Sequence, residues 1–287
     1  MIMKRINTAF LVAVLITAIV PNCYGQYTTD WVANTFGTDA ARVGNVARSM
    51  WIAPEGVVYT ASMWDENEGS IAIYQNGQST GSMGAHGESQ GGAITGNAVS
   101  IFAALQFNTT FGSGSVGRYN RTTHTRDLII PASATTTERR ADVITGLTTS
   151  GTLLYASDFP GNRVRVFTIE GVWQLDISVT SPGALAVDKA GNIWVAQKSL
   201  GTILEFSPSG VALNTISMGA SSRPSALYFD ASNAQLMVGD EGPDMNIKKY
   251  NIMDAPVLTG TFGVQGGYLN TATGIRGQVG DCKSEWQ

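Results

Sequence analysis

Acidic residues gather in three short segments that each follow a predicted β-strand, at positions 62–69, 157–161 and 239–244. Seven carboxylates lie in these segments: Asp65, Glu66, Glu68, Asp158, Asp240, Glu241 and Asp244. Hard divalent cations such as Ca²⁺ prefer oxygen ligands. Asp65, Asp158 and Asp240 are therefore candidate ligands of Ca²⁺ or another divalent cation. Because Asp and Gly are also common turn residues, the alternative is that these carboxylates are solvated.

Other polar and aromatic side chains lie in the same segments or in the loops between repeats. His86 could act as a general base, because imidazole titrates near neutral pH. A single His in a Gly-rich loop is more often merely exposed. The candidate ligand-binding residues are Trp64, Asp65, Glu68, His86, Asp158, Arg223 and Asp240. We predict no catalytic residue, since the chain has no strong nucleophile motif, phosphate-binding Gly loop or metal-binding His pair.

The strands that must position these loops form an internal repeat. A β-rich run recurs with its bulky second residue at positions 59, 102, 154, 194 and 237. A second run ends in an aromatic residue at 74, 119, 167, 206 and 250, and a β-branched residue always stands three positions earlier. Two patterns that stay in step over five copies indicate five equivalent units.

Each unit is predicted to contain four strands. In the fourth unit these are 183–188, 191–196, a strand ending at Phe206, and 211–216, separated by Gly-containing turns. Four strands in about 40 to 45 residues are typical of a β-propeller blade. The predicted fold is an all-β propeller of four-stranded blades, with five recognisable blades and an incomplete closing sixth blade. We expect the aromatics of the second and third strands to pack between blades.

The N-terminal segment is predicted to be a secretory signal peptide. Lys4 and Arg5 precede an apolar run from Ala9 to Val20, which is too short to cross a membrane. Cleavage is expected after Gly25, so the mature chain would be extracellular or periplasmic, with no membrane span.

The predicted domains are a signal peptide at 1–25, an N-terminal strand and linker at 26–46, five propeller repeats at 47–263, and a linker with an incomplete blade at 264–287. Residues 34–37 (Asn-Thr-Phe-Gly) match residues 260–263 (Gly-Thr-Phe-Gly), at the end of the fifth unit. We therefore expect residues 30–36 to form the outer strand of the closing blade. No strand pattern follows residue 281, so the sequence predicts a truncated sixth blade and poor solubility or self-association.

Composition excludes several classes of protein. Of the 287 residues, 43% are hydrophobic and only 14% are charged, which excludes a disordered chain. Two cysteines are too few for a disulfide-stapled small fold or a Cys-based zinc site. The formal net charge of −4 argues against nucleic acid as a partner, because phosphate binding needs a basic surface.

The residues of two units resemble a known family. Residues 181–196, Ser-Pro-Gly-Ala-Leu-Ala-Val-Asp-Lys-Ala-Gly-Asn-Ile-Trp-Val-Ala, look like the first half of an NHL-type propeller repeat, and residues 155–158 with 161–167 resemble its second half. The similarity extends more loosely to gluconolactonase-like and streptogramin-lyase-like propellers. Such lactonases hold a divalent metal with Glu, Asn and Asp around the channel. Glu55 resembles their early Glu-Gly, but it aligns with Ala190, in a turn on the wrong face, so no family catalytic residue is assigned.

Two function classes follow from the sequence. We favour a secreted, non-catalytic NHL-like propeller that binds an extracellular protein, glycan or small molecule on its loop-rich face, the face carrying the second-to-third strand loops and the loops between blades. The alternative is a metal-dependent, lactonase-like hydrolase or lyase that uses the acidic rim of the same loops. A third possibility is a truncated product without a function. One fold can support either of the first two classes.

Overall fold

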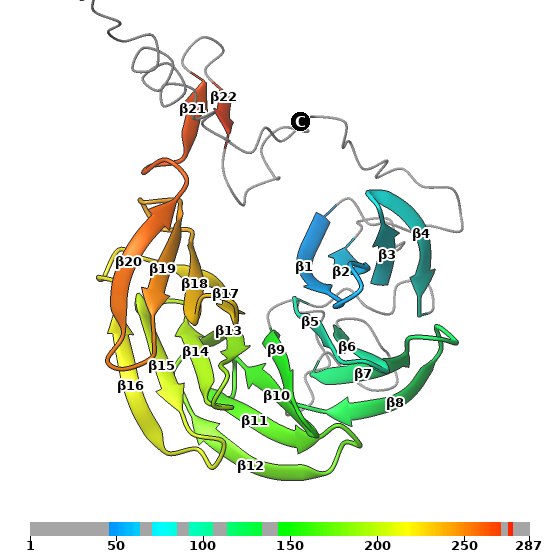
Figure 1. The fold of residues 1–287 in the computed structure, drawn as a ribbon. Helices are drawn as coiled ribbons and strands as arrows, with labels where there is room; N and C mark the ends of the chain where they lie inside the picture. Colours follow the sequence, from blue (N-terminus) through cyan, green and yellow to red (C-terminus); the bar gives the residue numbers. More distant parts are fainter. Residues whose placement is uncertain are drawn as a thin grey trace, which may run out of the picture. The chain divides into compact units, whose positions relative to one another are not determined.

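The computed structural model describes residues 46–63, 71–84, 92–105, 114–133, 143–270 and 275–277. In this part of the chain, five antiparallel sheets of four strands each follow one another in sequence and form a five-bladed β-propeller (Figure 1). The predicted fold class is confirmed. No helix among the described residues is long and apolar enough to cross a membrane.

Each blade is a meander of consecutive strands. Blade 1 contains β1 (Val46–Ile52), β2 (Val58–Met63), β3 (Ile71–Gln75) and β4 (Gln78–Met83), and blade 2 contains β5 (Ile94–Gly96), β6 (Ser100–Leu105), β7 (Ser115–Asn120) and β8 (Arg126–Pro131). Blade 3 contains β9 (Ile144–Ser150), β10 (Leu153–Asp158), β11 (Arg163–Thr168) and β12 (Trp173–Ser178). Blade 4 contains β13 (Pro182–Val187), β14 (Ile193–Gln197), β15 (Thr202–Phe206) and β16 (Ala212–Ser217). Blade 5 contains β17 (Pro224–Asp230), β18 (Gln235–Asp240), β19 (Ile247–Asn251) and β20 (Val257–Phe262).

Most of the repeated apolar residues pack between successive blades, as expected. Side chains alternate between the two faces of a strand. Residues three positions apart, such as Ile203 and Phe206, therefore lie on opposite faces. Ile203 packs with Trp194 against blade 5, whereas Phe206 packs against blade 3. This spacing buries both faces of an inner blade.

The register of blade 3 corrects one repeat position. Leu154 pairs with Phe167, just as Ile193 pairs with Phe206 in blade 4. Tyr155, and not Leu154, is therefore the equivalent of Trp194. The prediction was wrong by one residue because two bulky residues stand side by side at the start of β10 and the sequence does not show which one faces the next blade.

Close approach between the first strands of neighbouring blades explains the small residues there. A Cβ atom added to Gly146 of β9 would lie 2.1 Å from the carbonyl oxygen of Gly183 in β13. The same carbonyl accepts a 2.7 Å hydrogen bond from Ser157 Oγ. Only glycine at position 146 allows this contact between blades 3 and 4.

The turn between β13 and β14 shows how the repeat sequence sets local structure. The Asp188 carboxylate accepts hydrogen bonds from the backbone N–H groups of Ala190 (2.8 Å) and Asn192 (3.0 Å). Gly191 has φ of +85°, a conformation that favours glycine. The other Asp188 oxygen accepts a 3.0 Å hydrogen bond from the Trp194 indole, which ties the turn to the core.

The predicted ends of the chain fall largely outside the described residues. This holds for the signal peptide at 1–25, for the proposed closing strand at 30–36 and for most of 264–287. A two-stranded antiparallel sheet follows blade 5 and consists of β21 (Tyr268–Asn270) and β22 (Ile275–Gly277). The incomplete sixth blade remains a prediction.

Candidate functional site

Two of the acidic residues selected from the sequence end the second strands of their blades. Asp158 is the last residue of β10 and is fully buried. Its carboxylate accepts hydrogen bonds from Ser133 Oγ (2.6 Å), from the backbone N–H of Gly161 (3.2 Å) and from Arg163 Nε (2.9 Å). A Cβ on Gly161 would lie 2.2 Å from this carboxylate, so the loop requires glycine there.

Asp240, the last residue of β18, has an equivalent set of partners. It accepts hydrogen bonds from the backbone N–H groups of Arg223 (2.7 Å) and Gly242 (2.8 Å) and forms an ion pair with the Lys248 ammonium. Burial by itself would raise the pKa of Asp240, but these hydrogen bonds outweigh it and the pKa is lowered. Burial likewise opposes a charged Lys248, whose pKa is nevertheless raised by Asp240 and Asp244.

These contacts give Asp158 and Asp240 a structural role. Each already has a cationic partner from the third strand of its own blade, together with N–H donors that fix the adjacent loop. No group of three or more metal-ligating His, Cys, Asp or Glu side chains gathers among the described residues. Asp65, the third predicted ligand, lies outside them. The donor set that the structure describes therefore does not fit a divalent cation.

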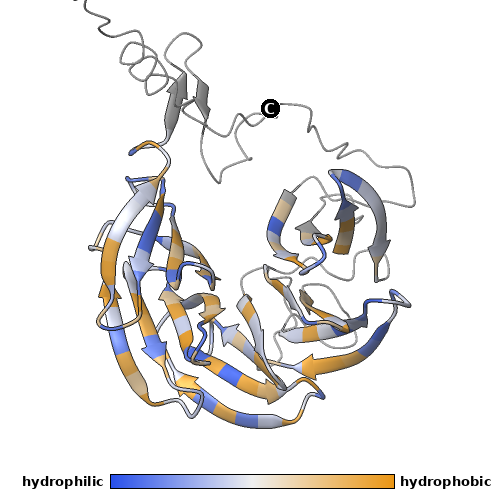
Figure 2. Ribbon diagram, in the orientation of Figure 1, coloured by the Kyte–Doolittle hydropathy of each residue, from blue (hydrophilic) through white to orange (hydrophobic). Residues whose placement is uncertain are grey.

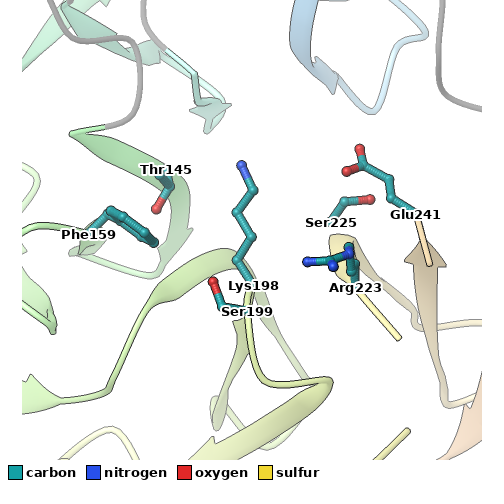
Figure 3. Close-up of a pocket in the computed structure, with 7 residues that line it drawn as sticks. All are labelled: Thr145, Phe159, Lys198, Ser199, Arg223, Ser225 and Glu241. Carbon is teal, nitrogen blue, oxygen red and sulfur yellow. The ribbon is translucent and has the colours of Figure 1, made fainter. Parts of the chain in front are cut away.

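A pocket of about 190 Å³ lies on the loop-rich face, between blades 3, 4 and 5 (Figure 3). The lining residues come from these three blades and the loops next to them: Thr145, Phe159, Lys198, Ser199, Arg223, Ser225 and Glu241. Figure 3 shows the Lys198 side chain extending between Thr145 and Phe159 on one side and Arg223, Ser225 and Glu241 on the other. The pocket is smaller than the roughly 300–1,000 Å³ of a drug-sized site.

Three lining residues occupy the same position in their blades. Phe159, Lys198 and Glu241 each follow the last residue of the second strand. In blade 4 that last residue is Gln197, which accepts a hydrogen bond from Thr202 Oγ1 and donates one of 3.0 Å to the carbonyl of Thr180. The buried polar residue at each strand end therefore holds the loop whose next side chain lines the pocket.

The backbone on the blade 5 side of the pocket is fixed in the same way. Asp240 binds the N–H of Arg223, and the Glu241 N–H donates a 2.9 Å hydrogen bond to the Arg223 carbonyl. Opposite them, the Lys198 N–H donates to the carbonyl of Ser181 at 3.0 Å. The backbone of each charged lining residue, Lys198, Arg223 and Glu241, is therefore fixed by hydrogen bonds.

The pocket carries an excess of positive charge. Lys198 and Arg223 contribute two formal positive charges and Glu241 one negative charge. All three are exposed, and within the described parts of the chain their side chains form no ion pair. The Thr145 hydroxyl donates to the Pro182 carbonyl at 2.7 Å, so its oxygen can still accept a hydrogen bond. The arrangement can bind a small anion that also carries hydroxyl groups.

The predicted ligand-binding residues have different places in the structure. Arg223 lines the pocket, whereas Asp158 and Asp240 lie next to it as loop anchors. Trp64, Asp65, Glu68 and His86 lie outside the described residues. Sequence reasoning missed Thr145, Phe159, Lys198, Ser199 and Ser225 as site residues. The available signal was positional: Phe159 and Lys198 follow a polar residue at the end of a second strand.

Glu55, which resembles the early Glu-Gly of the lactonases, lies in the turn between β1 and β2. This is the opposite end of the second strand from the pocket loops, as the repeat alignment predicted. Its carboxylate forms an ion pair with Arg121. The Arg121 guanidinium also lies 5.4 Å from the Trp51 ring centre and 5.3 Å from that of Tyr59. In this structure Glu55 is therefore the exposed ion-pair partner of an arginine that packs on Trp51 and Tyr59.

Comparison with known families agrees with the looser resemblance noted in the sequence. Residues 145–238 match the family described as SMP-30/gluconolactonase/LRE-like region. This segment runs from β9 to β18 and includes six of the seven lining residues of the pocket. Only Glu241 lies beyond its end. No curated protein matches the chain.

Several solved structures share the propeller fold. A putative 6-phosphogluconolactonase from Bacteroides uniformis aligns with a TM-score of 0.59 and 14% identity, over 83% of this chain and 85% of that protein. Virginiamycin B lyase from Staphylococcus aureus aligns with a TM-score of 0.58 and 13% identity, over 78% and 71%. The computationally designed protein Ika8 aligns with a TM-score of 0.53 and 16% identity, over 76% of this chain but only 61% of the designed protein. These identities establish the fold alone.

Proposed function

We propose that this chain is a non-catalytic β-propeller that binds a small hydroxylated carboxylate, of the sugar-acid class, in the pocket between blades 3, 4 and 5. The observation that carries the proposal is the pair of cations, Lys198 and Arg223, held on fixed loops around a small pocket. Charge-assisted hydrogen bonds from Lys or Arg to a carboxylate are among the stronger polar contacts in proteins.

The other lining groups suit the remainder of such a ligand. Glu241 can accept hydrogen bonds from ligand hydroxyls, and the Ser199 and Ser225 hydroxyls can donate or accept. Phe159 provides an apolar wall against which the C–H groups of a sugar can pack. A volume of about 190 Å³ favours a single sugar unit over a longer chain. Export of the mature chain is proposed from the sequence only, because residues 1–45 lie outside the described residues.

The binding test compares three probes by isothermal titration calorimetry. D-glucuronate carries both a carboxylate and hydroxyls, D-glucose carries only hydroxyls, and succinate carries only carboxylates. We expect glucuronate to bind, glucose to bind at least tenfold more weakly because it lacks the carboxylate, and succinate to bind more weakly than glucuronate because it lacks the hydroxyls. Removing one cation, in Lys198→Gln or Arg223→Gln, should weaken glucuronate binding about tenfold or more, since a hydrogen bond to a charged group contributes roughly 1.5–3 kcal/mol.

Lys189→Gln is the matched control. Lys189 is an exposed lysine in the β13–β14 turn, at the other end of blade 4 from the pocket. Its loss should leave glucuronate binding unchanged. Equal binding of glucose and glucuronate, or an equal effect of all three variants, would contradict the proposed anion site.

A lactonase-like hydrolase is the second candidate, and the family match to residues 145–238 favours it. That activity would use a divalent metal, for which the described residues provide no complete donor set. Hydrolysis of glucono-1,5-lactone in the presence of Ca²⁺ or Zn²⁺, abolished by a chelator, would support this candidate over the binding function.

A further inference from the structure

One face of blade 5 exposes several apolar side chains, with Lys249 of β19 among them. Tyr228 of β17, Met237 of β18, Ile247 of β19 and Phe262 of β20 lie on this face, as the pairs Tyr228–Met237 and Ile247–Phe262 show. Residues on the other face, such as Leu236, pack against blade 4. Tyr228 is 65% exposed and Phe262 is 54% exposed. We call these four residues the free face of blade 5. Figure 2 shows the strands of blade 5 coloured by the hydropathy of each residue.

The equivalent face is buried in every other blade. The residues that correspond to Ile247 and Phe262 are the pairs Ile71–Met83, Val116–Ile130, Val164–Ile177 and Ile203–Ile216. All eight are at most 4% exposed. In each case the next blade along the chain covers them. Blade 5 therefore carries one half of an inter-blade interface.

Blade 1 carries the other half. Met50 and Ile52 of β1 pair with Thr60 and Val58, as Leu185 and Val187 pair with Val195 and Ile193 in blade 4. Leu185 is buried against blade 3. In contrast, Met50 is 61% exposed and Ile52 is 57% exposed. We call Met50 and Ile52 the free face of blade 1.

We propose that the free face of blade 5 binds the free face of blade 1 of a second copy of this chain, in a head-to-tail contact. The argument is continuity with the four interfaces inside the chain. In each of them, the face of one blade that corresponds to the free face of blade 5 packs against the face of the next blade that corresponds to the free face of blade 1. The two free faces therefore correspond to the two sides of one inter-blade interface. Contacts of this kind are heterologous, and they propagate into larger assemblies unless the rotation between copies closes a ring.

Sedimentation velocity over a range of concentrations tests the proposal with the full chain. The wild-type protein should form dimers and larger species as the concentration rises. A charge on either free face, in Phe262→Asp or Met50→Asp, should reduce the protein to monomers. Both residues are exposed, so the thermal midpoint should stay close to that of the wild type. Val211→Asp, at a 59% exposed valine between β15 and β16, is the control and should associate like the wild type.

Mixing the two variants separates a specific contact from damage to the fold. Phe262→Asp retains an intact blade 1 face and Met50→Asp retains an intact blade 5 face. An equimolar mixture should therefore form a dimer and no larger species. Three results would overturn the proposal: a monomeric wild type at all concentrations, association that only one of the two variants abolishes, or a mixture that stays monomeric.

Discussion

At the scale of single residues, two of the three carboxylates predicted as metal ligands, Asp158 and Asp240, hold adjacent loops through hydrogen bonds and ion pairs. The sequence shows the acidic residue at the end of a second strand, but its cationic partner stands five positions later in blade 3 (Asp158, Arg163) and eight positions later in blade 5 (Asp240, Lys248). The blade 3 pair was predictable, because Asp158 and Arg163 are directly opposite in the β10–β11 register. The blade 5 pair depends on a longer loop, whose path the sequence does not give.

The Asp240–Lys248 pair leads to a prediction about stability. Asp240→Asn leaves a buried ammonium with only Asp244 as its carboxylate partner. Removing one member of a buried ion pair costs about 3–5 kcal/mol, and the remaining contact with Asp244 should keep the loss near the lower end of this range. Urea denaturation at pH 7 measures it. Asp254→Asn, at an exposed aspartate in the β19–β20 loop, is the control and should change the free energy of unfolding by less than about 0.5 kcal/mol.

The same variant has a defined pH dependence. The pKa of Asp240 is lowered in the folded state from its ordinary value of 3.8. The carboxylate therefore stabilises the fold fully above this value, and the contribution is lost as the pH falls through the lower folded pKa. The stability difference between the wild type and Asp240→Asn should be constant between pH 6 and about pH 5 and should shrink below about pH 4. A difference that does not change at low pH would contradict the assigned ion pair.

At the scale of strands and blades, the sequence was most informative. In blade 4 the predicted strands 183–188 and 211–216 are observed as Pro182–Val187 and Ala212–Ser217. Strand positions could be predicted because apolar residues at fixed spacing decide which face is buried, and a shift of one residue would expose them all. The pocket could not be predicted to the same extent. Its lining residues come mostly from loops of three blades, and the alternation of buried and exposed residues within strands does not determine the conformation of the loops.

Trp194 of β14 tests this description of the blade core. It is fully buried, faces blade 5 and donates its indole N–H to Asp188. Trp194→Ala should lower the free energy of unfolding by about 3–5 kcal/mol, a large part of the roughly 5–15 kcal/mol of a typical domain. Trp173→Ala is the matched control, at a tryptophan of β12 that is 54% exposed. Thermal or urea unfolding should show a much smaller loss for Trp173→Ala; equal losses would place Trp194 outside the core.

At the scale of the whole molecule, the blades differ in how many of their faces are covered. Blade 4 is covered on one face by blade 3 and on the other by blade 5. Among the residues that the structure describes, no blade covers one face of blade 5 or one face of blade 1. In repeat architectures, the stability of a unit depends on the interfaces with its neighbours. The series of blades should therefore be most stable in its middle and least stable at blades 1 and 5, although all five have the same strand plan.

Hydrogen exchange measures this difference directly. We expect the backbone amides of β14 and β15 to exchange more slowly than those of β18 and β19, which occupy the same central positions in blade 5. Amide protection follows the free energy of local opening, and a blade that is covered on only one face opens at a lower free-energy cost.

The comparison of exchange rates should be made at a concentration where the chain is monomeric and again at one where it associates. Head-to-tail contact would raise protection in blades 1 and 5 and leave blade 4 unchanged, because only the free faces become covered. Equal protection in all five blades of the monomer would mean that they unfold as one cooperative unit, and the free faces would then have no effect on local stability.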